Sequence, residues 1–210
     1  MKLDILVFGA HPDDVELGCG GTIIKEAQKG KKVGIIDLTR GELGTRGTFQ
    51  IRDEETKKAS AILGVSVREN MNFKDGFFKD DEEHKLPLIK KIRHYQPEIV
   101  ITNALSDRHP DHPRGAQITI DACFLSGLEK IDTGQPKWRP SAIFHYIQFN
   151  SQIPDVVIDI SKQIHLKNKA VKAYKSQFYN SKSKESKTII SSKNFLESVN
   201  YRAKDLGRQS

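Results

Sequence analysis

The sequence of 210 residues has little cysteine and no long hydrophobic run. Its two cysteines, Cys19 and Cys123, are too few for a disulfide framework, and without an export signal they indicate a reducing cytoplasm. No stretch of about 18 apolar residues occurs, so the sequence contains no candidate membrane span. The apolar run before His11 is too short for a signal peptide. We therefore expect a cytoplasmic protein with no membrane partner and one domain over residues 1–210.

Two common nucleotide-binding motifs are also missing. The turn after the first apolar run has no G-x-G-x-x-G, and no G-x-x-x-x-G-K-[ST] occurs anywhere. The glycine-rich residues 18–21 fall inside a stretch with a helical pattern. There they favour close packing of a helix against a neighbouring loop or strand.

Positive charge is concentrated at one end of the chain. The net charge is +7, but residues 1–160 contain 22 basic and 24 acidic side chains, and residues 161–210 contain 12 and 3. Three interpretations are open: a solvated lysine-rich surface, a positive field that attracts an anionic small molecule, or nucleic-acid binding. Because the basic stretch has few aromatic residues and no nucleic-acid module, we expect no nucleic-acid partner.

Short apolar runs alternate with amphipathic stretches along most of the chain, which predicts strands separated by helices. The predicted strands are 4–9, 32–38, 66–72, 98–102, 142–148 and 156–160. The predicted helices are 15–29, 51–63, 80–95, 115–126 and 161–176, the last capped by Ser161. This order is typical of an α/β protein with a Rossmann-like, mostly parallel sheet flanked by helices. The Ser- and Lys-rich residues 180–193 predict a mobile loop.

Polar, ionisable clusters follow three of the predicted strands. Residues 10–16 come after the first strand, residues 39–47 after the second and residues 106–112 after the fourth. Ligands of an open parallel sheet bind beyond the carboxyl ends of its strands. We therefore expect the functional site at this edge.

Three side chains in these clusters suit a metal ion. His11 and Asp14 lie three residues apart at a strand-to-helix turn, and His112 follows a neighbouring strand. A single histidine after a strand is most often a cap or a loop residue. Two H-P-D triplets after separate strands instead favour a catalytic zinc site, which uses three protein ligands and leaves one position for water.

Further residues of the clusters suit catalysis beside a metal. Asp13 can accept a proton from the attacking water, although a carboxylate at a helix amino terminus is also stabilised by the helix dipole. His109 can face the site and stabilise an oxyanion as an imidazolium. Asp111 can hold the ring of His109, or it can simply form a turn after Pro110.

These motifs resemble the PIG-L/LmbE family of zinc-dependent N-acetylglucosaminyl deacetylases. The resemblance covers at least residues 3–175 and rests on A-H-P-D-D-V-E at 10–16, G-C-G-G-T at 18–22, T-R-G-E at 39–42 and H-P-D-H at 109–112. Within the family, the chain is most similar to the branch that deacetylates N-acetylglucosaminyl-L-malate in bacillithiol biosynthesis. Mycothiol-pathway deacetylases and amide hydrolases share the same core motifs.

The resemblance implies a role for each matched residue. The metal ligands are His11, Asp14 and His112, the general base is Asp13, and the oxyanion is stabilised by His109 with Asp111 as its partner. Arg52 matches an arginine that contacts the substrate. Some relatives place a tyrosine where this chain has Phe195, which implies that a hydroxyl near the site is missing.

A malate-bearing substrate would carry two carboxylates, which arginine binds bidentately. Arg52 is the first candidate for this contact, and the reserves on the same edge are Arg108, Arg40 and Arg46. The ordinary alternative is that Arg52 pairs with Asp53, Glu55 or another surface carboxylate.

The predicted cofactor is Zn²⁺, with Fe²⁺ as the alternative metal, and the predicted partner is a small anionic sugar conjugate. The family resemblance also implies a homo-oligomer, with a hexamer as one form. Two other functions remain open: a zinc amidase that acts on a thiol conjugate, and a basic nucleic-acid-binding protein.

Overall fold

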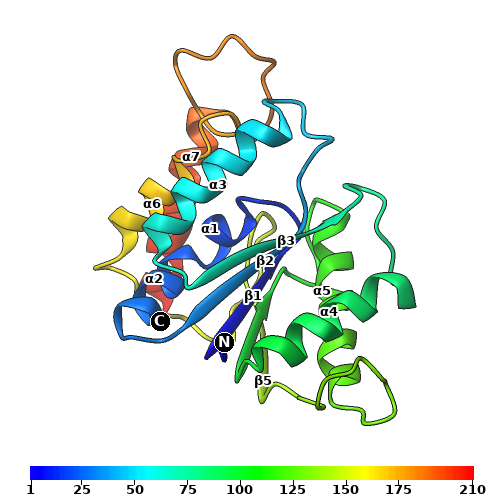
Figure 1. Ribbon diagram of the computed structural model, residues 1–210. Coiled ribbons are helices and arrows are strands. Elements are labelled where there is room, and N and C mark those ends of the chain that lie inside the picture. Colours follow the sequence, from blue (N-terminus) through cyan, green and yellow to red (C-terminus); the bar gives the residue numbers. More distant parts are fainter.

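The computed structural model describes all 210 residues and has a five-stranded parallel sheet between two layers of helices (Figure 1). The strands are β1 (Ile5–Gly9), β2 (Val33–Thr39), β3 (Val67–Phe73), β4 (Ile99–Thr102) and β5 (Ala142–His145). Their order is β3-β2-β1-β4-β5, and every neighbouring pair is parallel. The predicted Rossmann-like α/β fold is confirmed.

Two groups of helices cover the two faces of the sheet (Figure 1). One face is covered by α4 (Glu82–Tyr95) and α5 (Asp111–Ser126). The helices on the other side are α1 (Asp14–Gly18), α2 (Gly20–Gln28), α3 (Phe49–Leu63), α6 (Ile164–Val171) and α7 (Lys193–Gln209). No helix is both long enough and apolar enough to cross a membrane.

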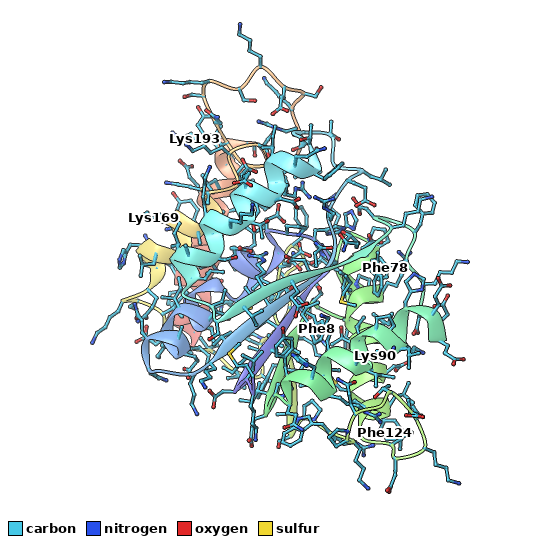
Figure 2. All side chains as sticks on the ribbon, viewed as in Figure 1. Phe8, Phe78, Lys90, Phe124, Lys169 and Lys193 are labelled. Carbon is cyan, nitrogen blue, oxygen red and sulfur yellow. The ribbon has the colours of Figure 1, made fainter.

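The alternation of side chains along β1 explains why this strand is apolar throughout. Leu6 and Phe8 pack into the core beneath α4 and α5, whereas Ile5 and Val7 pack into the core on the opposite face. Figure 2 shows Phe8 on the central sheet and Phe78 near the helices that cover one face. A strand buried on both faces needs apolar residues at every position.

The glycine-rich segment at 18–21 interrupts the helix predicted at 15–29. Cys19 leaves the helical conformation and separates α1 from α2. A Cβ atom on Gly18 would lie 2.1 Å from the ring of Tyr146, and one on Gly21 would lie 2.4 Å from Ile160. The close packing expected of these glycines is therefore confirmed, but the continuous helix is not.

Other boundaries also differ from the predictions. The predicted strand at 156–160 is not present, because this segment is largely solvent-exposed and pairs with no strand. The predicted helix at 161–176 shortens to α6, with Gln163 and not Ser161 at its start. The residues from 193 onward, to which no element was assigned, form α7.

The start of α5 matters most for the site. The sequence predicted a polar loop up to residue 114, but the helix begins at Asp111. Pro110 precedes it, in a position where the missing N–H costs no helical hydrogen bond. Asp111 and His112 therefore lie on the rigid first turn of a helix.

Candidate metal and catalytic site

A cavity of about 490 Å³ lies at the carboxyl edge of the sheet, where its lining includes residues from each of the three polar clusters. The strand order reverses at this edge, because β2 and β3 follow on one side of β1 whereas β4 and β5 lie on its other side (Figure 1). This reversal is the usual ligand-binding position in an open α/β sheet. The structure thus brings the three clusters together.

Three imidazoles meet in this cavity. His11, His109 and His112 each offer a ring nitrogen, and these nitrogens lie within 4.8 Å of one another. The ring centres of His11 and His109 are 4.6 Å apart, and those of His109 and His112 are 5.2 Å apart. The strand-to-helix turn after β1 supplies His11, the segment that leads into α5 supplies His109, and the first turn of α5 supplies His112.

Asp14 lies between two of these rings. Its Oδ2 atom is 3.5 Å from Nδ1 of His11, and its Oδ1 atom is 3.3 Å from Nε2 of His112. The residues predicted as metal ligands, His11, Asp14 and His112, are therefore adjacent and almost fully buried. His109 is a further nitrogen donor within the same reach.

The donor set fits a divalent cation. Nδ1 of His112 is buried without a hydrogen bond, although it lies 3.2 Å from Oδ1 of Asp107. Burial lowers the pKa of His112, but the carboxylates of Asp14 and Asp107 outweigh this effect and raise the pKa to about 9. Ring nitrogens combined with carboxylate oxygens suit zinc and similar metals. The cluster thus attracts positive charge and offers ligands of the right kind.

Asp13 differs from Asp14 in its surroundings. It is buried, its carboxylate accepts no hydrogen bond from the protein, and its backbone has a left-handed conformation with φ of 107°. Burial raises the pKa of Asp13 to about 7, while Arg52 opposes the shift and Asp14 adds to it. A strained backbone and an unsatisfied carboxylate are typical of a functional position.

The position of Asp111 differs from the expected one. Its carboxylate does not hold the ring of His109 but accepts hydrogen bonds from the backbone of Gly76 (2.8 Å) and from Arg114 (2.5 Å), and it lies 3.3 Å from Nε2 of His11. Only the backbone N–H of Asp111 reaches Nδ1 of His109. Because Asp111 lies on the first helical turn, its side chain faces the loop after β3.

The expected imidazolium form of His109 also conflicts with the structure. Burial, together with the neighbouring His11 and His112, lowers the pKa of His109. The ring accepts a hydrogen bond at Nδ1, which leaves the proton on Nε2. His109 is thus a neutral donor through Nε2.

Four residues that contact the predicted ligands were not predicted from the sequence: Asp75, Asn103, Asp107 and Gln148. Asp75 accepts from the backbone of Leu43 (3.0 Å) and lies 3.1 Å from Nε2 of His11, so it joins the ring to the loop after β2. Both Asp75 and Asn103 follow closely after predicted strands. Polar clusters were identified after only three of the predicted strands. The same search after every predicted strand would have found Asp75 and Asn103.

Two amides orient the carboxylate of Asp14. Nδ2 of Asn103 donates to Oδ2 of Asp14 at 3.1 Å, and Nε2 of Gln148 donates to Oδ1 at 2.5 Å. Asn103 also donates to Gln148 at 2.8 Å. This network holds both oxygen atoms of the Asp14 carboxylate, as the outer contacts of metal ligands commonly do.

The four candidate arginines have different environments. Arg40 pairs with Asp53. Arg46 donates to the carbonyl of Ser176 (2.8 Å) and the hydroxyl of Ser183 (2.9 Å). In contrast, Arg52 is buried in the cavity wall, and neither its side chain nor that of Arg108 donates a hydrogen bond to the protein. The ordinary alternative for Arg52, pairing with Asp53, is therefore not what the structure has.

Comparison with known proteins identifies the family of this chain. Fold and site together define the class: an α/β protein with a candidate His/Asp metal centre at the carboxyl edge of its sheet. A family model described as PIG-L: GlcNAc-PI de-N-acetylase matches residues 6–123, more than half of the chain. The chain belongs to the PIG-L family and is a deacetylase of that family.

Several known proteins are similar to this chain over much of their length. The chain is 35% identical over 130 residues to an uncharacterized deacetylase of Escherichia coli K12, covering 57% of this chain and 67% of that protein. It is 29% identical over 190 residues to the diacetylchitobiose deacetylase of Thermococcus kodakarensis (83% and 70%). It is 26% identical over 187 residues to a probable N-acetyl-alpha-D-glucosaminyl L-malate deacetylase of Bacillus anthracis (83% and 81%).

Solved structures share the whole fold. The conserved protein TT1542 from Thermus thermophilus superimposes with a TM-score of 0.90 at 35% identity, covering 99% of this chain and 89% of that one. The 4-carboxy-2-hydroxymuconate hydratase of Pseudomonas putida KT2440 has a TM-score of 0.81 at 24% identity, covering 100% and 87%. The fold thus also occurs in a hydratase.

Proposed function

We propose that this protein hydrolyses the N-acetyl group of an N-acetylglucosaminyl conjugate, and that the conjugate is N-acetylglucosaminyl-L-malate, used in bacillithiol biosynthesis. The observation that carries the proposal is the buried carboxylate of Asp13, which has no hydrogen-bond partner and lines the same cavity as three imidazoles. A free carboxylate beside a metal site is suited to take a proton from water.

His11, Asp14 and His112 would hold the metal, which we propose to be Zn²⁺ with Fe²⁺ as the alternative. The metal supplies a Lewis acid for the acetamide carbonyl and for water. Asn103 and Gln148 keep the carboxylate of Asp14 turned toward the imidazoles. Asp75 and Asp111 hold the ring of His11 from the opposite side.

The remaining residues move protons and stabilise charge. Asp13 accepts the proton of the attacking water as the new carbon–oxygen bond forms. Nε2–H of His109 donates a hydrogen bond to the carbonyl oxygen as negative charge develops there. Asp13 then returns the proton to the sugar nitrogen as the carbon–nitrogen bond breaks, which yields acetate and a free amine.

The substrate part of the proposal is supported by the chemistry of the cavity. Its wall includes the unpaired Arg52 beside Asp13, and Arg108 lies at the loop after β4. We assign both to substrate binding, because a carboxylated sugar conjugate would supply the missing anionic partners. The size of the cavity is in the range of small-molecule sites.

An acetate-release assay tests this function. Metal-depleted protein is reconstituted with Zn²⁺ or Fe²⁺ and offered N-acetylglucosaminyl-L-malate, N-acetylglucosamine, diacetylchitobiose and an N-acylated thiol conjugate. We expect metal-dependent release of equal amounts of acetate and amine, fastest with the malate conjugate. Faster cleavage of the thiol conjugate would favour the amidase alternative, and no cleavage of any acetamide would refute deacetylation.

The homo-oligomer and the absence of a nucleic-acid partner stay predictions. Light scattering after size-exclusion chromatography tests the oligomer. Steeply salt-dependent retention on DNA that survives removal of the metal would support the nucleic-acid alternative.

A further inference from the structure

The carboxy-terminal helix contributes to the wall of the cavity. Phe195 and Arg202 of α7 both line it, together with residues 188–190 just before the helix. Phe195, Val199 and Arg202 are spaced four and three residues apart, so they share one face of α7. Because Val199 is buried against the core formed by α1, α3 and α6, this face is held toward the site.

An aromatic wall runs from the loop after β5 to α7. The ring centres of Phe149 and Phe195 are 6.2 Å apart, and Phe195 stacks in turn on Phe178 at the same distance. The guanidinium of Arg108 lies 4.8 Å from the centre of the Phe149 ring. The wall therefore presents flat apolar surface with a cation at one end.

Arg202 is partly shielded from solvent but has no partner. It donates no hydrogen bond to the protein and forms no ion pair within 4.0 Å. Burial lowers the pKa of Arg202, and the negative charge of Asp107 only partly compensates. None of the side-chain nitrogen atoms of Arg202 is fully buried, so the five N–H donors of this guanidinium remain available to a ligand in the cavity.

Arg93 and Arg68, two arginines with structural roles, have acceptors for their guanidinium groups within the protein. Arg93 donates to the carbonyls of Ser126, Leu128 and Ile131 at 3.0, 2.8 and 2.7 Å. Arg68 binds the carboxylates of Asp37 and Glu16. Against this pattern, the unpaired guanidinium of Arg202 in a cavity wall is better explained by a ligand than by the fold.

We infer that Arg202 is a specificity-determining residue: with Arg108 and the Phe149–Phe195 wall it forms an anion subsite that binds a carboxylate of the group attached to the sugar. The inference rests on the proposed function, since it assumes a carboxylated conjugate. The guanidinium fork offers two parallel donors to a carboxylate. The aromatic wall supports the apolar face of the same ligand.

Apart from Arg108, which directly precedes His109, this subsite lies outside the segment that contains the reacting centre. The candidate metal and proton-transfer residues lie between His11 and His112, within the matched family region of residues 6–123. Phe149, Phe195 and Arg202 lie beyond it. Substitution of Arg202 should therefore change the choice of substrate and leave the chemistry intact.

The test compares Arg202→Gln with the wild type on two substrates, N-acetylglucosaminyl-L-malate and its uncharged dimethyl ester. We expect kcat/KM for the charged substrate to fall by about 10–100-fold, as for a lost charged hydrogen bond, and that for the ester by less than about threefold. Arg202→Lys keeps the charge without the fork and should be intermediate. The matched control, Lys204→Gln, removes an exposed charge from the same helix and should have no effect.

A second measurement does not depend on turnover. L-malate should raise the Tm of the metal-loaded wild type more than that of Arg202→Gln at equal metal content, since any contact of malate with the metal is common to both. Equal losses on the two substrates, or equal stabilisation by malate, would overturn the inference. If the wild type cleaves neither substrate, the proposed function fails, whereas a malate shift lost in Arg202→Gln still supports the subsite.

Discussion

The backbone amide of Asp111 donates a hydrogen bond to Nδ1 of His109, 3.3 Å away, and so leaves the proton of the neutral imidazole on Nε2. The ring thereby gains a fixed donor without becoming charged. This relationship suits stabilisation of an oxyanion but also places a third ring nitrogen near two predicted ligands.

His109→Ala separates these two roles. We expect the variant to retain stoichiometric metal and to lose roughly 10²–10³-fold in kcat, as for removal of one oxyanion donor. Metal content by mass spectrometry and acetate release give the two readouts. Loss of metal would instead make His109 a ligand, and an effect on KM alone would indicate ground-state binding.

Asp13 and Asp14 are neighbours with different predicted roles. Asp13→Asn should keep the metal and lower kcat by about 10²–10⁴-fold, because the general base is lost. Asp14→Ala, His11→Ala and His112→Ala should each lose metal. Because positions 13 and 14 are neighbours, each variant controls for general disruption of this turn by the other. Stoichiometric metal in Asp14→Ala would show that Asp14 is not a metal ligand.

Asn103 should act on metal affinity through Asp14. Asn103→Leu removes the donor to Oδ2 of Asp14 and the contact with Gln148, so we expect roughly 10–100-fold weaker metal binding. Competition with a chelator of known affinity measures it. Gln117→Leu, which removes an exposed amide from α5, should leave the affinity unchanged.

The glycine at position 41 should be needed to place Arg52. A Cβ atom there would lie 1.7 Å from Nη1 of Arg52, and φ is +63°. Gly41→Ala should therefore reduce kcat/KM for the malate conjugate as Arg52→Ala does, by the equivalent of about 2 kcal/mol. Gly134→Ala is the control, because its φ is +68° but nothing lies within 4 Å. If kcat/KM fell by a similar factor in both glycine variants, backbone strain and not displacement of Arg52 would be the cause.

Lys167 provides a prediction about stability. Burial lowers the pKa of Lys167 to about 8, from 10.5, and Arg202 adds to the shift. The folded state thus binds fewer protons than the unfolded state between pH 8 and about 10.5, so stability should rise with pH across this window. Below pH 8 Lys167 is charged in both the folded and the unfolded state, so burial of its ammonium group lowers the free energy of unfolding by the full amount.

Lys167→Met should remove this cost and raise the free energy of unfolding near pH 7 by on the order of 2–3 kcal/mol. The gain should shrink toward zero as the pH approaches 10.5. Urea unfolding at several pH values measures it, and Lys169→Met, an exposed position on the same helix, is the control. A gain that does not vary with pH would mean that packing, not charge, is responsible.

Much of the fold could be predicted because β1, β2 and β4 are apolar at nearly every position, which only a sheet covered on both faces explains. The hydrophobic pattern of the sequence predicted wrong element boundaries where contacts between distant residues determine the secondary structure. The approach of Tyr146 to Gly18 accompanies a break that helical periodicity does not show. Residues 156–158 have a strand pattern but no strand beside them.

The site was predictable as far as its residues follow strands directly. His11 and His112 could be placed because the carboxyl ends of parallel strands meet at one edge. Gln148 and Arg202 could not, because no local signal connects them with β1. The hydrogen-bond partners of the Asp111 carboxylate could not be predicted either, because they depend on whether residue 111 lies in a loop or on the first turn of α5.

The aromatic wall and Arg202 lie at residues 149–202, after all the residues that would carry out the hydrolysis. Arg202 and the aromatic wall, which we assign to selectivity, therefore lie in a later stretch of the chain than the chemistry, whereas Arg52 and Arg108 lie in the same stretch as the chemistry. A protein of this kind can exchange its second stretch and acquire another substrate while its reacting centre stays unchanged. Chimaeras joined after Gln148, which keep its contact with Asp14, would be a direct route to redesigned specificity.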